Sequence, residues 1–277
     1  MARIIAIVNQ KGGVGKTATA VNLAAALAAT EQRVLLLDCD PQGNASSGFG
    51  LRRGGPHPSF YPFLLGRNTL EEVVRRVVVP WLHVVPSSAD LSGAEIELVT
   101  VAAREGWLRK RLKDAVDAYD TVLLDCPPSL GLLTVNALVA ASAVLVPLQC
   151  EFYAMEGMSQ LLRTLDVLRR GLNPGLALEG VVLTLFDDTA MGQVQIARDV
   201  RHHLGEKVFR TVIPRHGAVS EAPSFGKPVL WYDLHSAGAQ AYLRLAQEML
   251  SKNTVSESRN SRSAGGPAGP ETAKGAP

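Results

Sequence analysis

A lysine- and glycine-rich stretch near the start of the chain has the residue types of a phosphate-binding loop. It stands between an apolar run at residues 4–8 and an alanine-rich run at residues 18–29, and it reads Lys11-Gly12-Gly13-Val14-Gly15-Lys16-Thr17. Glycines let the backbone turn its N–H groups toward phosphate oxygens, beside the positive end of a helix. In such a loop Lys16 neutralises the β- and γ-phosphates, and the Thr17 hydroxyl ligates magnesium. The chain is therefore predicted to bind a nucleoside triphosphate with Mg²⁺.

Aspartates end two other apolar runs of the chain. Asp38 and Asp40 follow residues 34–37, and Asp125 follows residues 121–124. Ligands of open α/β sheets bind at the carboxyl ends of the strands, which is where these side chains are expected. A carboxylate there can align a water molecule with the γ-phosphate while Mg²⁺ screens the negative charge.

The elements that must position these residues alternate between apolar runs and helical patterns. This alternation predicts an α/β fold, a mostly parallel twisted sheet with helices on both faces. The expected strands are 4–8, 34–37, 82–85, 122–124, 144–148, 181–185 and 208–213. The expected helices are 16–29, 69–76, 95–116, 134–140, 156–170, 193–204 and 237–250. We expect one domain over residues 1–250 and a disordered, low-complexity tail over residues 251–277.

Composition favours a soluble, cytoplasmic nucleotide enzyme. The chain has 277 residues, is 47% hydrophobic and carries a net charge of +2, which gives no global reason to expect nucleic acid. No apolar run approaches the roughly 18 residues that a membrane span needs. The cysteines, Cys39, Cys126 and Cys150, are odd in number and form no Cys-x-x-Cys pair. Cys39 and Cys126 each follow an aspartate, but two thiols alone do not make a metal site.

The loop departs from the ordinary phosphate-loop pattern at its front. Gln10 stands where that pattern has its first glycine, and a second lysine, Lys11, follows it. This deviant Walker A form, together with the Asp-Cys-Asp-Pro-Gln-Gly-Asn segment at residues 38–44 and the Asp-Cys-Pro-Pro segment at residues 125–128, resembles the ParA/Soj chromosome-partitioning ATPases, in a wider group that includes MinD. The resemblance runs over residues 1–250. It implies a P-loop NTPase that hydrolyses ATP to ADP and phosphate slowly, is stimulated by a partner, and dimerises when ATP is bound.

The resemblance also implies a role for each charged residue of the site. Lys11 reaches across the dimer interface to the nucleotide of the partner subunit, as an arginine finger does, and is catalytic together with Lys16 and Asp40. Asp40 positions or deprotonates the attacking water. Asp38 supports the magnesium shell through water, and Asp125 holds a magnesium-bound water. Without the family pattern, Lys11 is equally well interpreted as a solvated loop lysine.

The remaining nucleotide contacts are expected on both sides of the phosphates. Ala18 stands where the family often has threonine, and it keeps its backbone N–H for phosphate. Pro214 and Arg215, after an apolar run, resemble the loop that flanks the adenine in the family, and Phe186 is a candidate to stack nearby. A Pro-Arg turn is also common on protein surfaces.

The implied partners are a second copy of the chain, a ParB-like protein and non-specific DNA. Two positions weaken the DNA prediction, because Thr189 and Ala218 replace arginines that face DNA in the family, and Asp188 adds a negative charge. A helix further along offers a replacement patch, which is also interpretable as a solvated helix face; its residues are Arg198, Arg201, His202 and His203.

Other members of the wider group fit less well. Larger plasmid partition proteins carry an N-terminal DNA-reading domain, whereas this chain starts directly at its first strand. MinD ends in an amphipathic membrane helix, but residues 251–258 have no apolar face, so no membrane contact is expected. The nitrogenase iron protein needs paired cysteines to bind its cluster, and this sequence has no such pair.

Two hypotheses for the function remain. The chain is either a partitioning ATPase, associated with the nucleoid if DNA is bound, or a related ATP switch that positions a protein cargo or regulates another system with little DNA binding.

Overall fold

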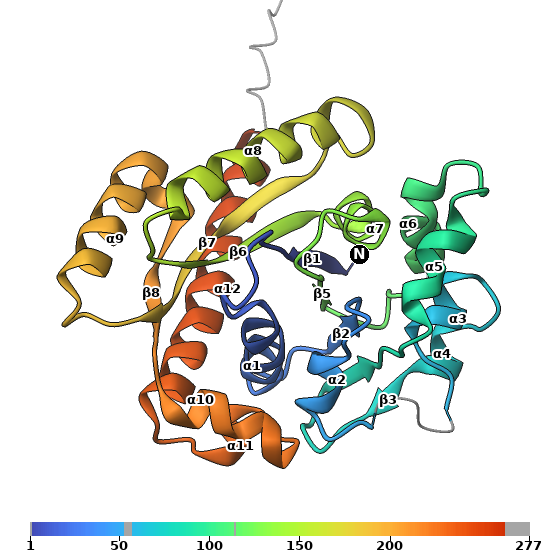
Figure 1. Cartoon of the computed structure of the whole chain (residues 1–277), viewed down its shortest axis with the longest axis horizontal. Helices are drawn as coiled ribbons and strands as arrows, with labels where there is room; N and C mark the ends of the chain where they lie inside the picture. Colours follow the sequence, from blue (N-terminus) through green and yellow to red (C-terminus); the bar gives the residue numbers. More distant parts are fainter. Residues whose placement is uncertain (1, 53–56, 114, 264–277) are drawn as a thin grey trace, which may run out of the picture.

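The computed structural model describes residues 2–52, 57–113 and 115–263, and these build one eight-stranded sheet flanked by helices (Figure 1). The strand order is β3-β4-β2-β5-β1-β6-β7-β8, and every neighbouring pair is parallel except β3 with β4. The strands are β1 (Arg3–Ile7), β2 (Val34–Asp38), β3 (Arg75–Arg76), β4 (Leu82–Val85), β5 (Thr121–Asp125), β6 (Ala143–Gln149), β7 (Ala177–Phe186) and β8 (Val208–Pro214). The predicted α/β class with a mostly parallel sheet is confirmed.

The helices fall into two layers, one on each face of the sheet. They are α1 (Lys16–Ala28), α2 (Asn44–Ser47), α3 (Phe60–Leu64), α4 (Leu70–Val73), α5 (Leu91–Leu98), α6 (Trp107–Leu112), α7 (Leu132–Ala140), α8 (Ala154–Gly171), α9 (Met191–Leu204), α10 (Gly217–Glu221), α11 (Val229–Tyr232) and α12 (Ala237–Ser263). Short 3₁₀ turns are η1 (Arg104–Gly106), η2 (Gly205–Lys207) and η3 (Ala222–Phe225). Figure 1 shows α1 and α12 side by side over the sheet.

Alternate residues of the central strands belong to two separate hydrophobic cores, one on each face of the sheet. In β1, Ala6 packs with helices α3 to α9, whereas Ile5 and Ile7 pack with α1, α2, α10, α11 and α12. In β2, Leu35 and Leu36 divide in the same way. Because successive side chains of a strand point to opposite faces, an uninterrupted apolar run is what a sheet covered on both sides requires. This double burial makes the sheet a rigid base for the loops at its edge.

Two of the expected helices are shorter than the sequence pattern suggests. The helix expected over residues 69–76 ends at Val73, and Arg75 with Arg76 instead forms the antiparallel edge strand β3. Its predicted start is correct, since Thr69 caps it in a capping box with Glu72. The helix expected over residues 95–116 is broken between α5 and α6. The β-branched run at residues 99–101 disfavours helix, and Ala103 adopts a left-handed φ of 53°.

The last helix extends beyond the domain boundary predicted at residue 250. It runs to Ser263, so residues 251–263 are helical where disorder was expected, and the division into a domain and a low-complexity tail remains a prediction. This segment contains neither glycine nor proline, the residues that end helices most effectively, and they first appear at Gly265. Residues 264–277 lie outside the described residues. In the part of the chain that the structure describes, no helix is both long and apolar enough to cross a membrane.

The exposed edge of the sheet at β8 is covered by a carboxylate from α12. Glu248 accepts hydrogen bonds from the backbone N–H of Arg210 at 2.8 Å, and from the N–H and hydroxyl of Thr211 at 2.9 and 2.7 Å. Burial acts to raise the pKa of Glu248, but these hydrogen bonds and Lys252 outweigh it and lower the pKa below its usual 4.5. The contact satisfies donors that an edge strand would otherwise offer to another chain.

Replacing Glu248 by alanine is expected to lower the melting temperature at pH 7 by about 5 °C, because three charge-assisted hydrogen bonds are lost from a partly buried site. A carboxyl whose pKa is lowered by folding stabilises the protein above its unfolded pKa, and that contribution disappears as the pH falls through the folded pKa. The difference between the two proteins should therefore shrink below about pH 4. Gln247→Ala, on the exposed face of the same helix, is the control in the thermal melts. An equal loss at pH 3 and pH 7 would contradict the account.

Candidate functional site: a nucleotide site at the carboxyl edge of the sheet

The sheet brings the phosphate loop and the aspartates that end β2 and β5 to one edge. β5 lies between β1 and β2, with Ile7 and Asp38 both in register with Asp125. The phosphate loop follows β1, so it emerges directly beside the two aspartates. The prediction that these residues lie together at the carboxyl ends of the strands is confirmed. Their chemical roles remain predictions.

The loop has the backbone conformation of a phosphate cradle. Gly13 and Gly15 have φ values of 75° and 83°, a region that favours glycine over other residues. Among the described residues, none of the hydrogen bonds is donated by a backbone amide of residues 12–18. A Cβ added at Gly12 or Gly13 would meet nothing within 4 Å, so this side of the loop is open. Open, unpaired amides at a helix N-terminus fit phosphate oxygens.

Lys16 lies folded against its own loop. The residue is only 7% exposed, and its Nζ donates a hydrogen bond to the carbonyl of Lys11 at 2.9 Å. Burial lowers the pKa of Lys16, while the charges of Asp125 and Asp40 act to raise it. A buried ammonium with a single carbonyl acceptor has donors left for an anion. Its position fits the predicted contact with β- and γ-phosphate oxygens.

Asp125 is fully buried, and neither of its carboxylate oxygens accepts a hydrogen bond from a described residue. Burial, followed by the charge of Asp38, raises the pKa of Asp125 well above its usual value. Thr17 and Lys16 lie close enough to lower the pKa but make no well-formed hydrogen bond with the carboxylate. A buried acceptor without a donor is costly, so this carboxylate fits a hydrated cation.

The residues present fit magnesium rather than a metal with many protein ligands. No set of three His, Cys, Asp or Glu side chains within residues 2–52, 57–113 and 115–263 is arranged to hold a metal ion. Magnesium usually keeps several waters and takes one or two protein ligands together with nucleotide phosphates. Thr17 would supply the direct ligand and Asp125 would hold a water of the shell.

Asp38 and Asp40 occupy different environments although one residue separates them. Asp38 is fully buried and accepts from the amide and hydroxyl of Ser46, at 2.7 and 2.6 Å, and from the amide of Asp40 at 3.3 Å. Burial raises the pKa of Asp38 to about 6, against the effect of these hydrogen bonds. Asp40 accepts from the amide of Gln42 at 2.9 Å. Asp38 thus fixes the loop that presents Asp40, and its predicted role in the magnesium shell remains a prediction.

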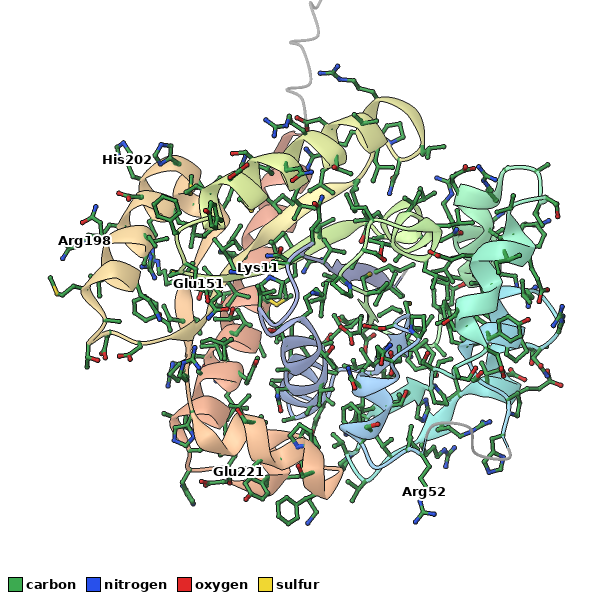
Figure 2. All side chains as sticks on the ribbon, in the orientation of Figure 1. Lys11, Arg52, Glu151, Arg198, His202 and Glu221 are labelled. Carbon is green, nitrogen blue, oxygen red and sulfur yellow. The ribbon has the colours of Figure 1, made fainter. Side chains whose placement is uncertain are left out.

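Lys11 points away from the loop that it begins. Its ammonium pairs with the carboxylate of Glu151, and both side chains are 44% exposed (Figure 2). Its amide donates to Oδ1 of Asn9 at 3.0 Å, and the Asn9 side chain donates to the carbonyl of Pro147 at 2.8 Å. The two lysines of the motif are therefore separated, with Lys16 inside the site and Lys11 on the rim.

The predicted base-flanking loop lies at the same edge of the sheet. Pro214 is in register with Phe186, and the amide of Arg215 donates to the Phe186 carbonyl at 3.0 Å. Thr184, two residues earlier on β7, donates its hydroxyl to the carbonyl of Val14 at 2.7 Å, which ties this strand to the phosphate loop. Contact of Pro214 and Arg215 with adenine remains a prediction.

The positions that bear on DNA binding differ in accessibility. Thr189 is exposed and hydrogen-bonded to Asp187, whereas Ala218 is only 7% exposed and packs in the core formed with α1 and α12. On α9, Arg198 and His202 stand one turn apart on an exposed face, as Figure 2 shows. His203 is also exposed, and Arg201 is half-buried. The predicted replacement patch is thus solvent-facing at three of its four residues.

Sequence reasoning missed three residues that organise the site. Ser46 and Thr184 hold Asp38 and the phosphate loop through hydroxyl groups, and no sequence pattern distinguishes them from ordinary core hydroxyls. Glu151 was detectable, because it is a carboxylate just past the carboxyl end of β6, the same signal that identified Asp38 and Asp125.

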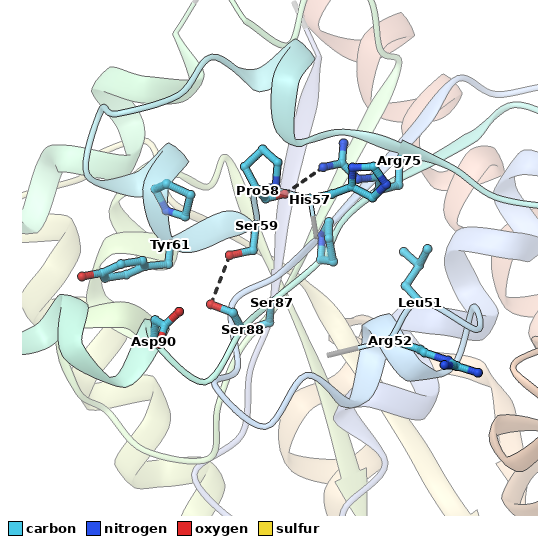
Figure 3. A pocket seen from close by; sticks show the side chains of 12 residues that line it. Leu51, Arg52, His57, Pro58, Ser59, Tyr61, Arg75, Ser87, Ser88 and Asp90 are labelled. Atoms are coloured by element: carbon cyan, nitrogen blue, oxygen red, sulfur yellow. Dashed lines mark hydrogen bonds between the residues drawn. The ribbon is translucent and has the colours of Figure 1, made fainter. Parts of the chain in front are cut away.

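A separate cavity of about 430 Å³ contains none of the predicted site residues (Figure 3). It is lined by residues that follow α2, begin α3 and follow β4, among them Arg52, Ser59 and Ser87, and by Arg75 of β3. One connection reaches the nucleotide edge, because the amide of Ser87 donates to the hydroxyl of Ser46 at 3.0 Å. The residues predicted to bind phosphate lie at the glycine loop and not in this cavity.

Comparison with known proteins identifies the family. A family model described as an AAA domain matches residues 2–178. The chromosome partitioning protein ParA of Caulobacter vibrioides (strain NA1000 / CB15N) is 54% identical over 256 residues, covering 90% of this chain and 94% of that protein. The sporulation initiation inhibitor protein Soj of Bacillus subtilis is 48% identical over 249 residues, covering 90% and 98%. This chain belongs to the ParA/Soj family.

A solved structure supports the same assignment for the fold and the cofactors. Cobyrinic acid a,c-diamide synthase from Mycobacterium smegmatis, with a bound ATP analogue and magnesium, is 36% identical and has a TM-score of 0.79 over 90% of this chain and 95% of that one. The predicted family and the P-loop ATPase fold are thereby confirmed, and the ATP analogue and magnesium bound by this neighbour are the two cofactors that the sequence predicts.

Proposed function

We propose that this chain is an ATP-dependent dimerising switch that acts in chromosome or plasmid partitioning with a ParB-like partner. The observation that supports this most is the separation of the two lysines of the phosphate loop. Lys16 is buried in its own site, while Lys11 is exposed on the rim and, among the described residues, its ammonium pairs only with Glu151. A lysine on the rim can contact the phosphates of a nucleotide that is bound to a second copy of the chain.

In this proposal each residue has one task in the ATP cycle. The amides of residues 12–18 and Lys16 bind the phosphates, and Thr17 with Asp125 positions the cation shell. Bound magnesium neutralises charge that develops on the phosphate oxygens. Asp40 orients the attacking water in line with the γ-phosphate, on a loop that Asp38 and Ser46 hold in place. Lys11 of one subunit offsets charge on the phosphates of the other, so that hydrolysis follows dimerisation.

A second candidate function is favoured by the DNA-facing positions. Thr189 carries no charge, and Ala218 is buried. A family member with weak DNA binding would position a protein cargo or regulate another system by the same nucleotide cycle. The exposed basic side chains of α9, Arg198 and His202, favour the partitioning hypothesis instead. The protein would be cytoplasmic under both, and associated with the nucleoid only under the first.

Binding to DNA separates the two candidates. We expect the Asp40→Ala protein with ATP and Mg²⁺ to bind random-sequence duplex DNA, and its affinity to fall steeply across a salt series. Adding Arg198→Ala should reduce the slope of log affinity against log salt by about 0.9, the value of one lost phosphate contact. Lys207→Ala, at the opposite edge of the sheet, is the matched control. If the ATP-bound dimer does not bind DNA even at low salt, the partitioning hypothesis is wrong and the cargo or regulatory function is favoured.

A further inference from the structure

Two neighbouring aromatic side chains protrude from the nucleotide edge and pack against each other. Phe152 is 85% exposed and Tyr153 is 68% exposed. Their ring centroids lie 5.0 Å apart with an interplanar angle of 87°, an edge-to-face pair. Aromatic surface left in water is unfavourable, and a contiguous exposed patch of it usually marks an interface.

The backbone presents this pair on an ordered turn. The segment joins the end of β6 at Gln149 to the start of α8 at Ala154. The amide of Glu151 donates to the carbonyl of Gln149 at 2.9 Å, and the amide of Ala154 donates to the carbonyl of Glu151 at 2.8 Å. Ala154 is itself buried in the core below. An aromatic pair fixed in this way loses little conformational freedom when a partner covers it.

The position of the pair indicates what covers it. Glu151, the residue before Phe152, is the ion-pair partner of Lys11. If Lys11 contacts the nucleotide of a second copy, that copy must approach within the length of a lysine side chain, roughly 6 Å. Any surface beside Lys11 on the same rim then lies against the second copy.

We propose that Phe152 and Tyr153 form an apolar contact of the ATP-dependent homodimer, beside the Lys11–Glu151 ion pair. The inference rests on the proposed dimerisation and adds the surface that carries it. In a two-fold symmetric dimer each aromatic pair is used twice, so one patch contributes two contacts. The ion pair must open when Lys11 turns to the second copy, whereas the rings need no rearrangement to be covered.

The test compares dimerisation of variants that all retain ATP. In the Asp40→Ala background, we expect the double substitution Phe152→Ser and Tyr153→Ser to weaken the dimer by about 30-fold or more, the loss typical of a hot spot. The dimer dissociation constant is measured by sedimentation velocity across protein concentrations with saturating ATP and Mg²⁺. Val167→Ser, which removes another exposed apolar residue from α8, is the matched control and should leave the constant unchanged.

The outcomes separate this inference from the proposed function. If the Asp40→Ala parent forms no dimer with ATP, the proposed function fails before the rings are tested, and the inference falls with it. If the parent dimerises and the aromatic double variant dimerises equally well, the inference is wrong while the switch stands. Binding of a fluorescent ATP analogue to the double variant must match the parent.

Discussion

Replacing Lys16 by alanine is expected to lower the affinity for ATP by a factor of about one hundred to ten thousand. The reason is that its buried ammonium, which donates to the carbonyl of Lys11, is the cation that we propose contacts two phosphate groups. Two hydrogen bonds between charged groups contribute about 3–6 kcal/mol, which corresponds to that range of affinity. Isothermal titration of the purified protein with ATP and Mg²⁺ measures the change directly.

The control for Lys16→Ala is the same substitution at Lys207, an exposed lysine at the opposite edge of the sheet. Circular dichroism must show that both variants keep the fold. Removing Lys16 also removes a cation that lowers the pKa of Asp125, so this carboxylate would hold its proton to still higher pH. ATP affinity equal to that of the parent in a folded Lys16→Ala protein would reject the phosphate-loop assignment.

Replacing Asp40 by alanine should abolish turnover while ATP binding is retained. A positioned acid or base typically contributes a factor of about 10²–10⁴ to the rate, and we expect kcat to fall by that amount. The substitution removes one hydrogen bond, from the amide of Gln42, but leaves Asp38 and Ser46 to hold the loop. Phosphate release at saturating ATP gives kcat, and titration with ATP gives the affinity.

A matched control for Asp40 is available on the same edge of the sheet. Asp188 is exposed in the loop after β7, and Asp188→Ala should hydrolyse ATP as the parent does. If Asp40→Ala turned over ATP at the parental rate, Asp40 would have no catalytic role. If it lost ATP affinity to the same extent as Lys16→Ala, its role would be in binding.

The parts of the fold that follow from local chemistry could be predicted from the sequence. The uninterrupted apolar runs correctly indicated strands covered on both faces, because a half-exposed strand would alternate. The glycines of the phosphate loop correctly indicated a tightly turning backbone, and Gly13 and Gly15 make that turn with positive φ values. Asp38 and Asp125 were expected at one edge, since parallel strands carry their carboxyl ends to the same side.

Features that depend on distant parts of the chain could not be predicted. The position of Glu151 at the carboxyl edge was detectable, but its pairing with Lys11, 140 residues away, was not, because that pairing depends on β6 lying next to β1. The end of the helix at Val73 results from pairing of Arg75 and Arg76 with β4, a tertiary contact that overrides helix propensity. The hydroxyl of Ser46 became part of the site only through the turn that brings it onto Asp38.

The central claim is that ATP joins two copies of this chain through Lys11, and sedimentation velocity tests it most directly. The Asp40→Ala protein with ATP and Mg²⁺ should sediment as a dimer, at twice the 29.5 kDa of the chain, and with ADP as a monomer. Adding Lys11→Gln to this background should leave a monomer that still binds ATP. A protein that stays monomeric with ATP, or that dimerises equally well without Lys11, would contradict the account.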